Sequence, residues 1–202
     1  MGIMFIATIP FCNSQIPIKN KQVITLQSVP ENASNKLLSD SKEILLRRLS
    51  FMSLRDVQIT QNNVKSELVI TVGDTIARET LSDLLVIQGH VSFKADSVLA
   101  LNEQDILEAH ANFQNPEQPE LCLTFKEKVW KLWEDITIRN KNKSLTFMID
   151  NKVYAAPHIM DKISHGKISL TGTGFSKNEV RKLVAIISSG TLPLKFTVVS
   201  YK

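Results

Sequence analysis

The chain has 202 residues, 43% of them hydrophobic and 22% charged, which is the composition of a folded protein whose core needs no stapling by disulfides or metal. Its 24 basic and 20 acidic residues give a net charge of +4 without a dense Lys/Arg run, which argues against nucleic acid as a partner. No apolar run approaches the roughly 20 residues that cross a bilayer, so we expect no transmembrane helix in this chain.

Residues 1–14 are expected to be a remnant of a signal peptide. Met1–Phe11 is apolar and uncharged, and small residues precede a cleavage site at Gln15. A basic leading region is lacking, and the alternative is a disordered or strand-like tail. Cleavage would leave Cys122 as the one cysteine, so we expect no intramolecular disulfide and a Cys122 that acts as a small core hydrophobe.

Residues 20–95 have the order of elements of a ferredoxin-like base subdomain, βαββαβ. Apolar periodicity predicts strand Val23–Gln27, helix Asn35–Met52, strands Val57–Thr60 and Leu68–Val72 around a hairpin loop at Gln61–Lys65, helix Leu81–Val86 and strand His90–Lys94. The polar residues 96–118 are expected to link this base to a second subdomain.

Residues 119–200 are predicted to form that second subdomain, an α+β head. Its strands are expected at Leu121–Phe125, Leu145–Ile149, Val153–Ala155, Ile168–Thr171 and Phe196–Val199. Two helices with apolar stripes are expected to start at capping boxes, one made by Thr124 with Glu127 and one by Ser176 with Glu179.

Turn and breaker residues divide the head. Asp150 and Asn151 both tolerate positive φ, which predicts a two-residue hairpin turn. Pro157 has no N–H for a ladder, so the strand before it should stop there. Gly172 marks a loop, and Gly190 lies where the last helix should be capped.

These pieces resemble the head subdomain of the periplasmic domain of SecD, a membrane protein of protein export. The family's Asp-Gly turn and Val-x-x-Ala-Pro-x-Ile segment correspond to Asp150, Asn151, Val153, Ala156, Pro157 and Ile159. Its Gly-x-x-x-Ile-x-Gly-x-Phe segment corresponds to Gly166, Leu170, Gly172 and Phe175, and its Ser-Gly-x-Leu-Pro ending to Ser189, Gly190, Leu192 and Pro193.

The resemblance extends more weakly to the base, where the helix containing Arg47 and Arg48 is similar to the family's arginine-rich first helix. It covers residues 20 to 200. It implies structural roles for Asp150, Asn151, Pro157, Gly166, Gly172, Gly190 and Pro193. The family's membrane helices have no counterpart here, so a proton-powered role is not carried over.

The resemblance implies a non-catalytic, exported module on the periplasmic or envelope side that holds polypeptide during translocation. It implies no cofactor and no metal. The expected partner is unfolded or emerging polypeptide, or a protein of the export machinery. The candidate surface comprises Trp130, Tyr154, Phe175 and Leu192. We expect one of Trp130 and Trp133 to be buried and the other partly exposed, and extended peptides could also pair with a free sheet edge.

Two other functions remain open from the residues. The module could be a protein–protein adaptor of an envelope complex that has lost the translocation role. It could also be a metal-dependent enzyme that uses His158, Asp161 and His165, although a polar exposed loop explains that spacing as well. Gly172 and Gly174 lack the third glycine of a phosphate loop, and Asp150 is better explained as a turn residue than as a catalytic carboxylate.

Overall fold

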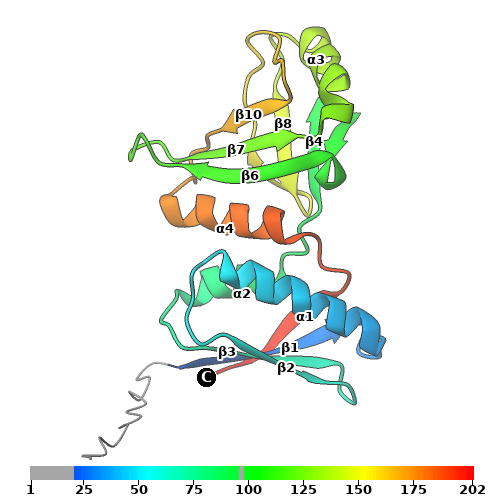
Figure 1. Ribbon diagram of the computed structural model, residues 1–202, viewed down its shortest axis with the longest axis vertical. Helices are drawn as coiled ribbons and strands as arrows, with labels where there is room; N and C mark the ends of the chain where they lie inside the picture. The colour runs from blue at the N-terminus through cyan, green and yellow to red at the C-terminus, as the bar shows by residue number, and fades with distance from the viewer. Residues whose placement is uncertain (1–20, 96–97) are drawn as a thin grey trace, which may run out of the picture.

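Two subdomains share the chain, as seen in a computed structural model that describes residues 21–95 and 98–202. Each subdomain combines helices with antiparallel sheets, so the predicted α+β class is confirmed (Figure 1). The predicted signal-peptide remnant, residues 1–14, lies outside the described residues.

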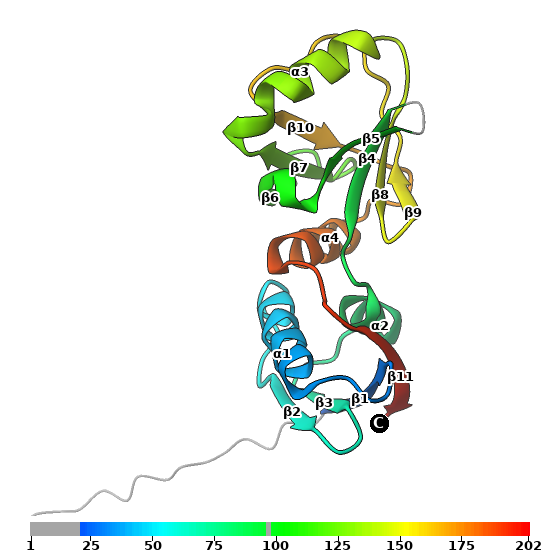
Figure 2. The same cartoon turned by 90° about the vertical axis from the view of Figure 1, so that its right-hand side faces the viewer.

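The base is a four-stranded antiparallel sheet with two helices on one face (Figures 1 and 2). The strand order is β11-β1-β3-β2, with β1 at Gln22–Val29, β2 at Gln58–Asn62, β3 at Glu67–Val72 and β11 at Lys195–Tyr201. The helices are α1, Asn35–Ser50, and α2, Arg78–Val86. Alternate side chains of the central strands, such as Leu26 and Ile70, are completely buried because successive strand residues point to opposite faces.

The last strand of the base is β11, and not the strand predicted at His90–Lys94. That segment forms β4, Val91–Ala95, which pairs with two strands of the head. The βαββαβ order holds with β11 as its sixth element, so the head is inserted into the base between α2 and β11. The predicted boundary at residue 95 is therefore corrected to the segment after α2, and the end of the head at residue 200 to the segment before β11.

The head contains two antiparallel sheets. One has the order β10-β7-β6, with β6 at Ile106–Asn112, β7 at Glu120–Phe125 and β10 at Lys167–Leu170. The other has the order β5-β4-β8-β9, with β5 at Val98–Asn102, β8 at Leu145–Ile149 and β9 at Lys152–Ala155.

Two of these strands, β5 and β6, arise from the segment predicted to be a linker. A short 3₁₀ helix, η1, Glu103–Asp105, connects them. The apolar run from Val98 to Leu101 is the signal for β5, and Leu101 is buried. The polar composition of residues 96–118 misled the prediction because both strands lie at sheet edges, where most side chains face solvent.

An aromatic cluster joins the two head sheets under α3, Trp130–Arg139, which follows the 3₁₀ helix η2, Glu127–Val129. The Phe93 ring lies 5.3 Å from Phe125, 5.1 Å from Phe147 and 5.9 Å from Trp133, measured between ring centroids. Phe93 comes from β4, and its burial in this cluster explains why β4 belongs to the head.

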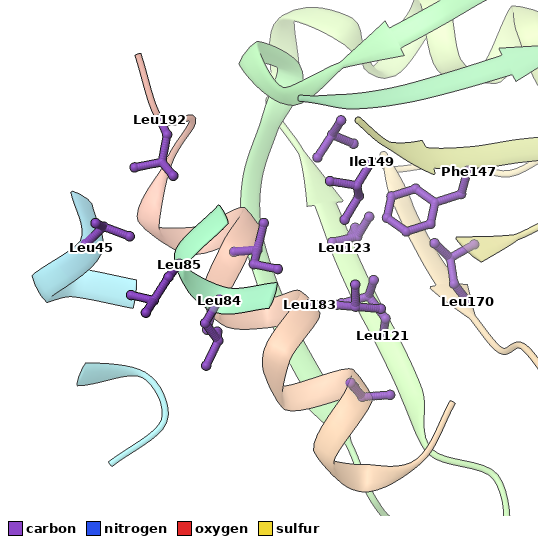
Figure 3. Close-up of a cluster of buried hydrophobic side chains, with 14 of the residues drawn as sticks. Leu45, Leu84, Leu85, Leu121, Leu123, Phe147, Ile149, Leu170, Leu183 and Leu192 are labelled. Atoms are coloured by element: carbon purple, nitrogen blue, oxygen red, sulfur yellow. The ribbon is translucent and has the colours of Figure 1, made fainter. Parts of the chain in front are cut away.

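The helix α4, Lys177–Ser189, lies between the head and the base (Figure 1). Figure 3 shows Leu183 of α4 near Leu121 of β7, while Leu45 of α1 and Leu84 and Leu85 of α2 lie on the base side. All five of these leucines are completely buried, so one continuous core runs through both subdomains.

One of the two predicted helix caps is confirmed and the other is wrong. Ser176 caps α4 as predicted, because its Oγ accepts the Glu179 N–H at 3.1 Å. The capping box at Thr124 is wrong, because Thr124 lies inside β7, and the following 3₁₀ helix η2 has Lys126 as its N-cap residue, without a side-chain cap. Asp150 and Asn151 both have positive φ, which confirms the predicted hairpin turn.

Candidate polypeptide-binding groove and the base–head junction

An apolar groove of about 580 Å³ lies between β5 and α3 at one edge of the head. Six of its nine lining residues are apolar, and three of them are well exposed, Val98 at 68%, Leu99 at 55% and Leu132 at 45%. The lining residues are Ala95, Val98, Leu99, Ala100, Leu132, Ile136, Arg139, Asn140 and Lys143. Exposed apolar surface that forms a concave site is typical of a binding surface.

The strand β5 borders this groove and is an edge strand. Among the described strands it pairs with β4 alone, so its other edge presents backbone N–H and C=O groups without a strand partner. Val98 is 68% exposed and Leu99 is 55% exposed, so neither α3 nor another described segment covers this end of the strand. An extended peptide could therefore add to the sheet here.

The end of the groove near the C-terminus of α3 is lined by basic residues. Arg139 and Lys143 line it, and no carboxylate does so among the described residues. The Arg139 Nε donates to the backbone oxygen of Asp135 at 3.3 Å, which directs the guanidinium along the helix.

Trp130, predicted to bind polypeptide, is half-buried and has a structural contact. Its Nε1–H donates to the Phe125 carbonyl at 2.9 Å. A Cβ atom at Gly166 would lie 2.2 Å from Trp130 Cδ1, so the ring packs on the glycine backbone. Trp133 is completely buried, which confirms that one tryptophan is buried and the other partly exposed.

The other predicted surface residues lie apart from the groove. Phe175 and Leu192 are 9% and 1% exposed, so burial in the core removes them from the candidate surface. Tyr154 is half-buried, and its burial raises the pKa of its hydroxyl. Tyr154 and Lys182 both line a second, polar hollow. Burial by itself lowers the pKa of Lys182, but the bonds of its ammonium group to Asp83 and Glu179 outweigh burial, so its pKa lies above the usual value.

The histidine-containing segment forms no metal site in the part of the chain that the structure describes, where no group of three or more ligand side chains gathers. Asp161 pairs with Lys141 at 3.2 Å, and His165 stacks edge-on against Trp130. Cys122 is half-buried, with its Sγ 3.5 Å from Ser169 Oγ, so the prediction of a core position is wrong. Alternate residues of β7 face outward, and Cys122 is one of them.

Most residues to which the family resemblance gave structural roles take part in backbone contacts or turns. The Pro157 carbonyl accepts the Leu145 N–H at 2.9 Å, after β9 has ended. Gly172 packs against Tyr154 and Phe175, Gly190 caps α4 with φ +91°, and Pro193 is exposed just before β11.

Asp150 not only forms the hairpin turn but also binds backbone N–H groups through its carboxylate. Its Oδ1 accepts the N–H groups of His90 at 2.9 Å and Gly89 at 3.1 Å, and its Oδ2 accepts the Gln88 N–H at 2.6 Å. The carboxylate is therefore a structural anchor for the segment that leaves the base, and three amide donors satisfy its charge.

Arg48 is the residue that sequence reasoning missed. It belongs to α1 and is completely buried, although it is charged. Its guanidinium donates to the carbonyls of Leu84 and Ile87 near the end of α2, and to the Gly190 carbonyl and Ser189 Oγ at the end of α4. The signal in the sequence was its spacing from Leu45, which places it on the apolar face of the helix.

Burial lowers the pKa of Arg48 to about 10, and the negative charge of Asp150 opposes that shift. Arg48 therefore stays protonated at neutral pH. Its positive charge lies at the C-terminal ends of two helices, where the helix dipoles favour a cation.

No helix among residues 21–95 and 98–202 is both long and apolar enough to cross a membrane. Comparison with protein families shows that residues 81–194 match the model of "SecDF, P1 head subdomain".

Among curated proteins, the protein translocase subunit SecD of Acidaminococcus fermentans is 26% identical over 179 residues, which are 88% of this chain and 42% of that protein. SecD of Calditerrivibrio nitroreducens is 27% identical over 165 residues, 81% of this chain and 31% of that protein. The chain thus spans less than half the length of these relatives.

Two solved structures share the fold. SecDF in its super-membrane-facing form superposes with a TM-score of 0.72 at 19% identity, covering 91% of this chain and 30% of that one. A second structure, described as a membrane component SecDF that enhances protein export, has a TM-score of 0.67 at 20% identity and covers 88% of this chain and 98% of that one. Since the family match spans more than half of the chain, the protein belongs to the SecD/SecDF family and carries its P1 head subdomain.

Proposed function

We propose that this chain is a non-catalytic, exported module that binds unfolded or emerging polypeptide during protein translocation. Its relatives are translocase subunits, and its site of action would be the periplasmic or envelope side of the membrane. The observation that carries the proposal is the exposed apolar groove beside the free edge of β5.

Two interactions would hold an extended chain in this groove. Backbone groups of the client would pair with β5, and its apolar side chains would bury against Leu99 and Leu132. Backbone pairing does not depend on the client's sequence, and apolar contact requires only that the client has apolar side chains. Many different clients would therefore bind. Folded proteins would bind poorly because their backbone groups are already paired.

The test is the binding of the purified chain to a fluorescently labelled unfolded precursor protein and to the same protein folded. Leu99→Ser should weaken binding of the unfolded form roughly tenfold, because an apolar side chain of this size contributes about 1.5 kcal/mol or more when buried. Leu107→Ser is the matched control, since Leu107 is a 64% exposed leucine on the edge strand β6, outside the groove.

Equal affinity for folded and unfolded forms, or equal losses in the two variants, would reject the groove as a client site. Absence of any binding would favour the adaptor alternative. A dedicated partner would then be expected to saturate a single site and to ignore unfolded chains.

A further inference from the structure

A cleft of about 570 Å³ lies between the base and the head, beside the segment by which the chain passes from α2 into β4. Both subdomains line it. The base contributes the ends of β1 and α2 and the start of β11, and the head contributes the start of β4 and the turn between β8 and β9 (Figure 2). The cleft shares no lining residue with the groove between β5 and α3, so it is a separate site.

Five polar side chains that line the cleft have no bonding partner in the part of the chain that the structure describes. Ser92 and Lys94 are two positions apart on β4 and therefore lie on the same face of its sheet. Asn151 belongs to the turn after β8, and Lys195 and Thr197 lie at the start of β11. None of the five side chains takes part in a hydrogen bond or an ion pair with another described residue. The cleft therefore offers donors that the protein itself does not use.

The cleft has little free negative charge. Asp150 is the one carboxylate among the described residues that line it. Its oxygens already accept the three successive amides of Gln88–His90, and the positive charge of the buried Arg48 acts on it as well. The His90 ring also lines the cleft, but its Nδ1 lies 3.4 Å from the carboxylate of Glu103, which does not. The two lysine ammonium groups thus have no carboxylate with which to pair.

The chemistry of the lining favours a polypeptide ligand that carries carboxylates. Ammonium, hydroxyl and amide groups all donate to carboxylate oxygens, and the bonds from ammonium groups are the strongest of these. Aliphatic side chains lie beside the donors, among them Val29, which is 47% exposed, and they suit the apolar parts of a peptide. Phe196 is buried, so its ring is not open to the stacking by which single-stranded nucleic acids are held. The volume is in the usual range of ligand sites.

We propose that this cleft binds an acidic segment of polypeptide, with Lys94 of the head and Lys195 of the base pairing with its Asp or Glu side chains. The hydroxyl groups of Ser92 and Thr197 and the amide of Asn151 supply further donors to the same segment. The proposal goes beyond the binding of unfolded chains in the groove and does not rest on it. It adds a second site with a different preference, for charge in place of apolar side chains.

The test is the binding of two short fluorescent peptides of equal length to the full-length chain, measured by fluorescence anisotropy at low salt. One peptide alternates valine with glutamate, and the other alternates valine with glutamine. The glutamate peptide should bind, and the glutamine peptide should bind roughly tenfold more weakly, because it cannot form ion pairs with the two lysines. Added salt should weaken binding of the glutamate peptide, since it screens these pairs.

Substitution of the lysines locates the peptide. Lys94→Gln and Lys195→Gln should each weaken binding of the glutamate peptide roughly fivefold and leave binding of the glutamine peptide unchanged. Lys195→Arg keeps the charge and should keep the affinity. Lys167→Gln is the matched control, because Lys167 is an exposed lysine at the first position of β10, as Lys195 is at the first position of β11, and it does not line the cleft. If circular dichroism shows that Lys94→Gln is unfolded, the exposed Lys195 decides the question.

The groove also has basic residues at one end, so the glutamate peptide must be shown to bind elsewhere. Leu99→Ser alters the groove alone and should leave binding of the glutamate peptide unchanged. A loss in Leu99→Ser as large as that in Lys195→Gln would place the peptide in the groove and overturn the proposal. A failure of the groove to bind unfolded precursor protein would leave the result for the cleft as it is.

Three further outcomes would overturn the proposal. The first is that the two peptides bind equally or not at all, and the second is that Lys167→Gln loses as much affinity as Lys195→Gln. The third is that vesicles containing phosphatidylglycerol bind with the same dependence on Lys94 and Lys195 while the glutamate peptide does not. The two lysines would then belong to a surface for anionic lipid.

Discussion

At the scale of single residues, Arg48 shows how one buried side chain can terminate two helices. The last carbonyls of a helix have no partners within it, and a buried end needs donors from elsewhere. Arg48 supplies them to α2 and α4 together, although its removal from water lowers its pKa. The charge is retained because several carbonyl oxygens replace the lost water.

Arg48→Met should therefore destabilise the chain by about 3 kcal/mol, because methionine fills the space but leaves the carbonyls buried and unpaired. Urea unfolding measures the loss. Arg55→Met, at an exposed site, should leave the unfolding midpoint nearly unchanged. Similar losses of unfolding free energy in the two variants would mean that water hydrogen-bonds the carbonyls that Arg48 no longer binds.

Gly166 offers a second test at this scale. Its φ is +58°, and an added Cβ would collide with the Trp130 ring at 2.2 Å. Gly166→Ala should cost about 2 kcal/mol or more, because both the backbone and the ring must shift. Gly174→Ala, whose Cβ would meet nothing within 4 Å, should be neutral or slightly stabilising. Thermal unfolding of the pair separates crowding from the general effect of losing a glycine.

At the scale of elements, sequence patterns located the helices and most strands, though not β5 and β6, but they did not identify which strands pair. The periodicity of α1, β3 and α4 depends on residues within each element, and these were predicted within a few residues. The pairing of β4 with β8, and of β11 with β1, depends on residues at least 50 positions away. Local patterns carry no information about such contacts, which is why β4 and β11 were assigned to the wrong subdomains.

Helix caps belong to the same scale. Ser176→Ala should lower stability by about 1 kcal/mol, since its hydroxyl binds a free N–H of the first turn of α4. Thr124, which has the same spacing to a glutamate, lies in β7 and caps nothing among the described residues. Thr124→Ala should therefore cost clearly less in the same urea experiment, and an equal cost would contradict the assigned cap.

The type of candidate site was predicted from the sequence, but the residues that form it were not. A free sheet edge was foreseen as a route for peptide binding, but β5 itself was hidden in a segment that was assigned as a linker. Aromatic residues were favoured because interfaces are rich in them, and yet Phe175 fills the core. The groove instead consists of aliphatic residues on an edge strand and a helix, which meet only in the folded chain.

At the scale of the whole molecule, the insertion of the head into the base determines which fragment of the chain can fold alone. A fragment of residues 88–192 holds both head sheets, α3 and α4, and should unfold cooperatively in urea. A fragment of residues 119–200, the head as first predicted, lacks β4, β5 and β6 and leaves Phe125 without Phe93. It should show no cooperative transition.

Tryptophan fluorescence follows both fragments, because Trp130 and Trp133 are present in each. The buried Trp133 should lose its apolar surroundings in a single step in the longer fragment. A cooperative transition in the shorter fragment would show that β7, β8 and β10 need no further strands.

The insertion also sets an order of events during synthesis. β1 lies between β3 and β11, so the base sheet waits for a strand that the ribosome makes about 120 residues after β3. The head is complete by then, since β4 to α4 all precede β11. A growing chain can therefore present a finished head before it has a finished base, and the part that would meet a client matures before the part that supports it.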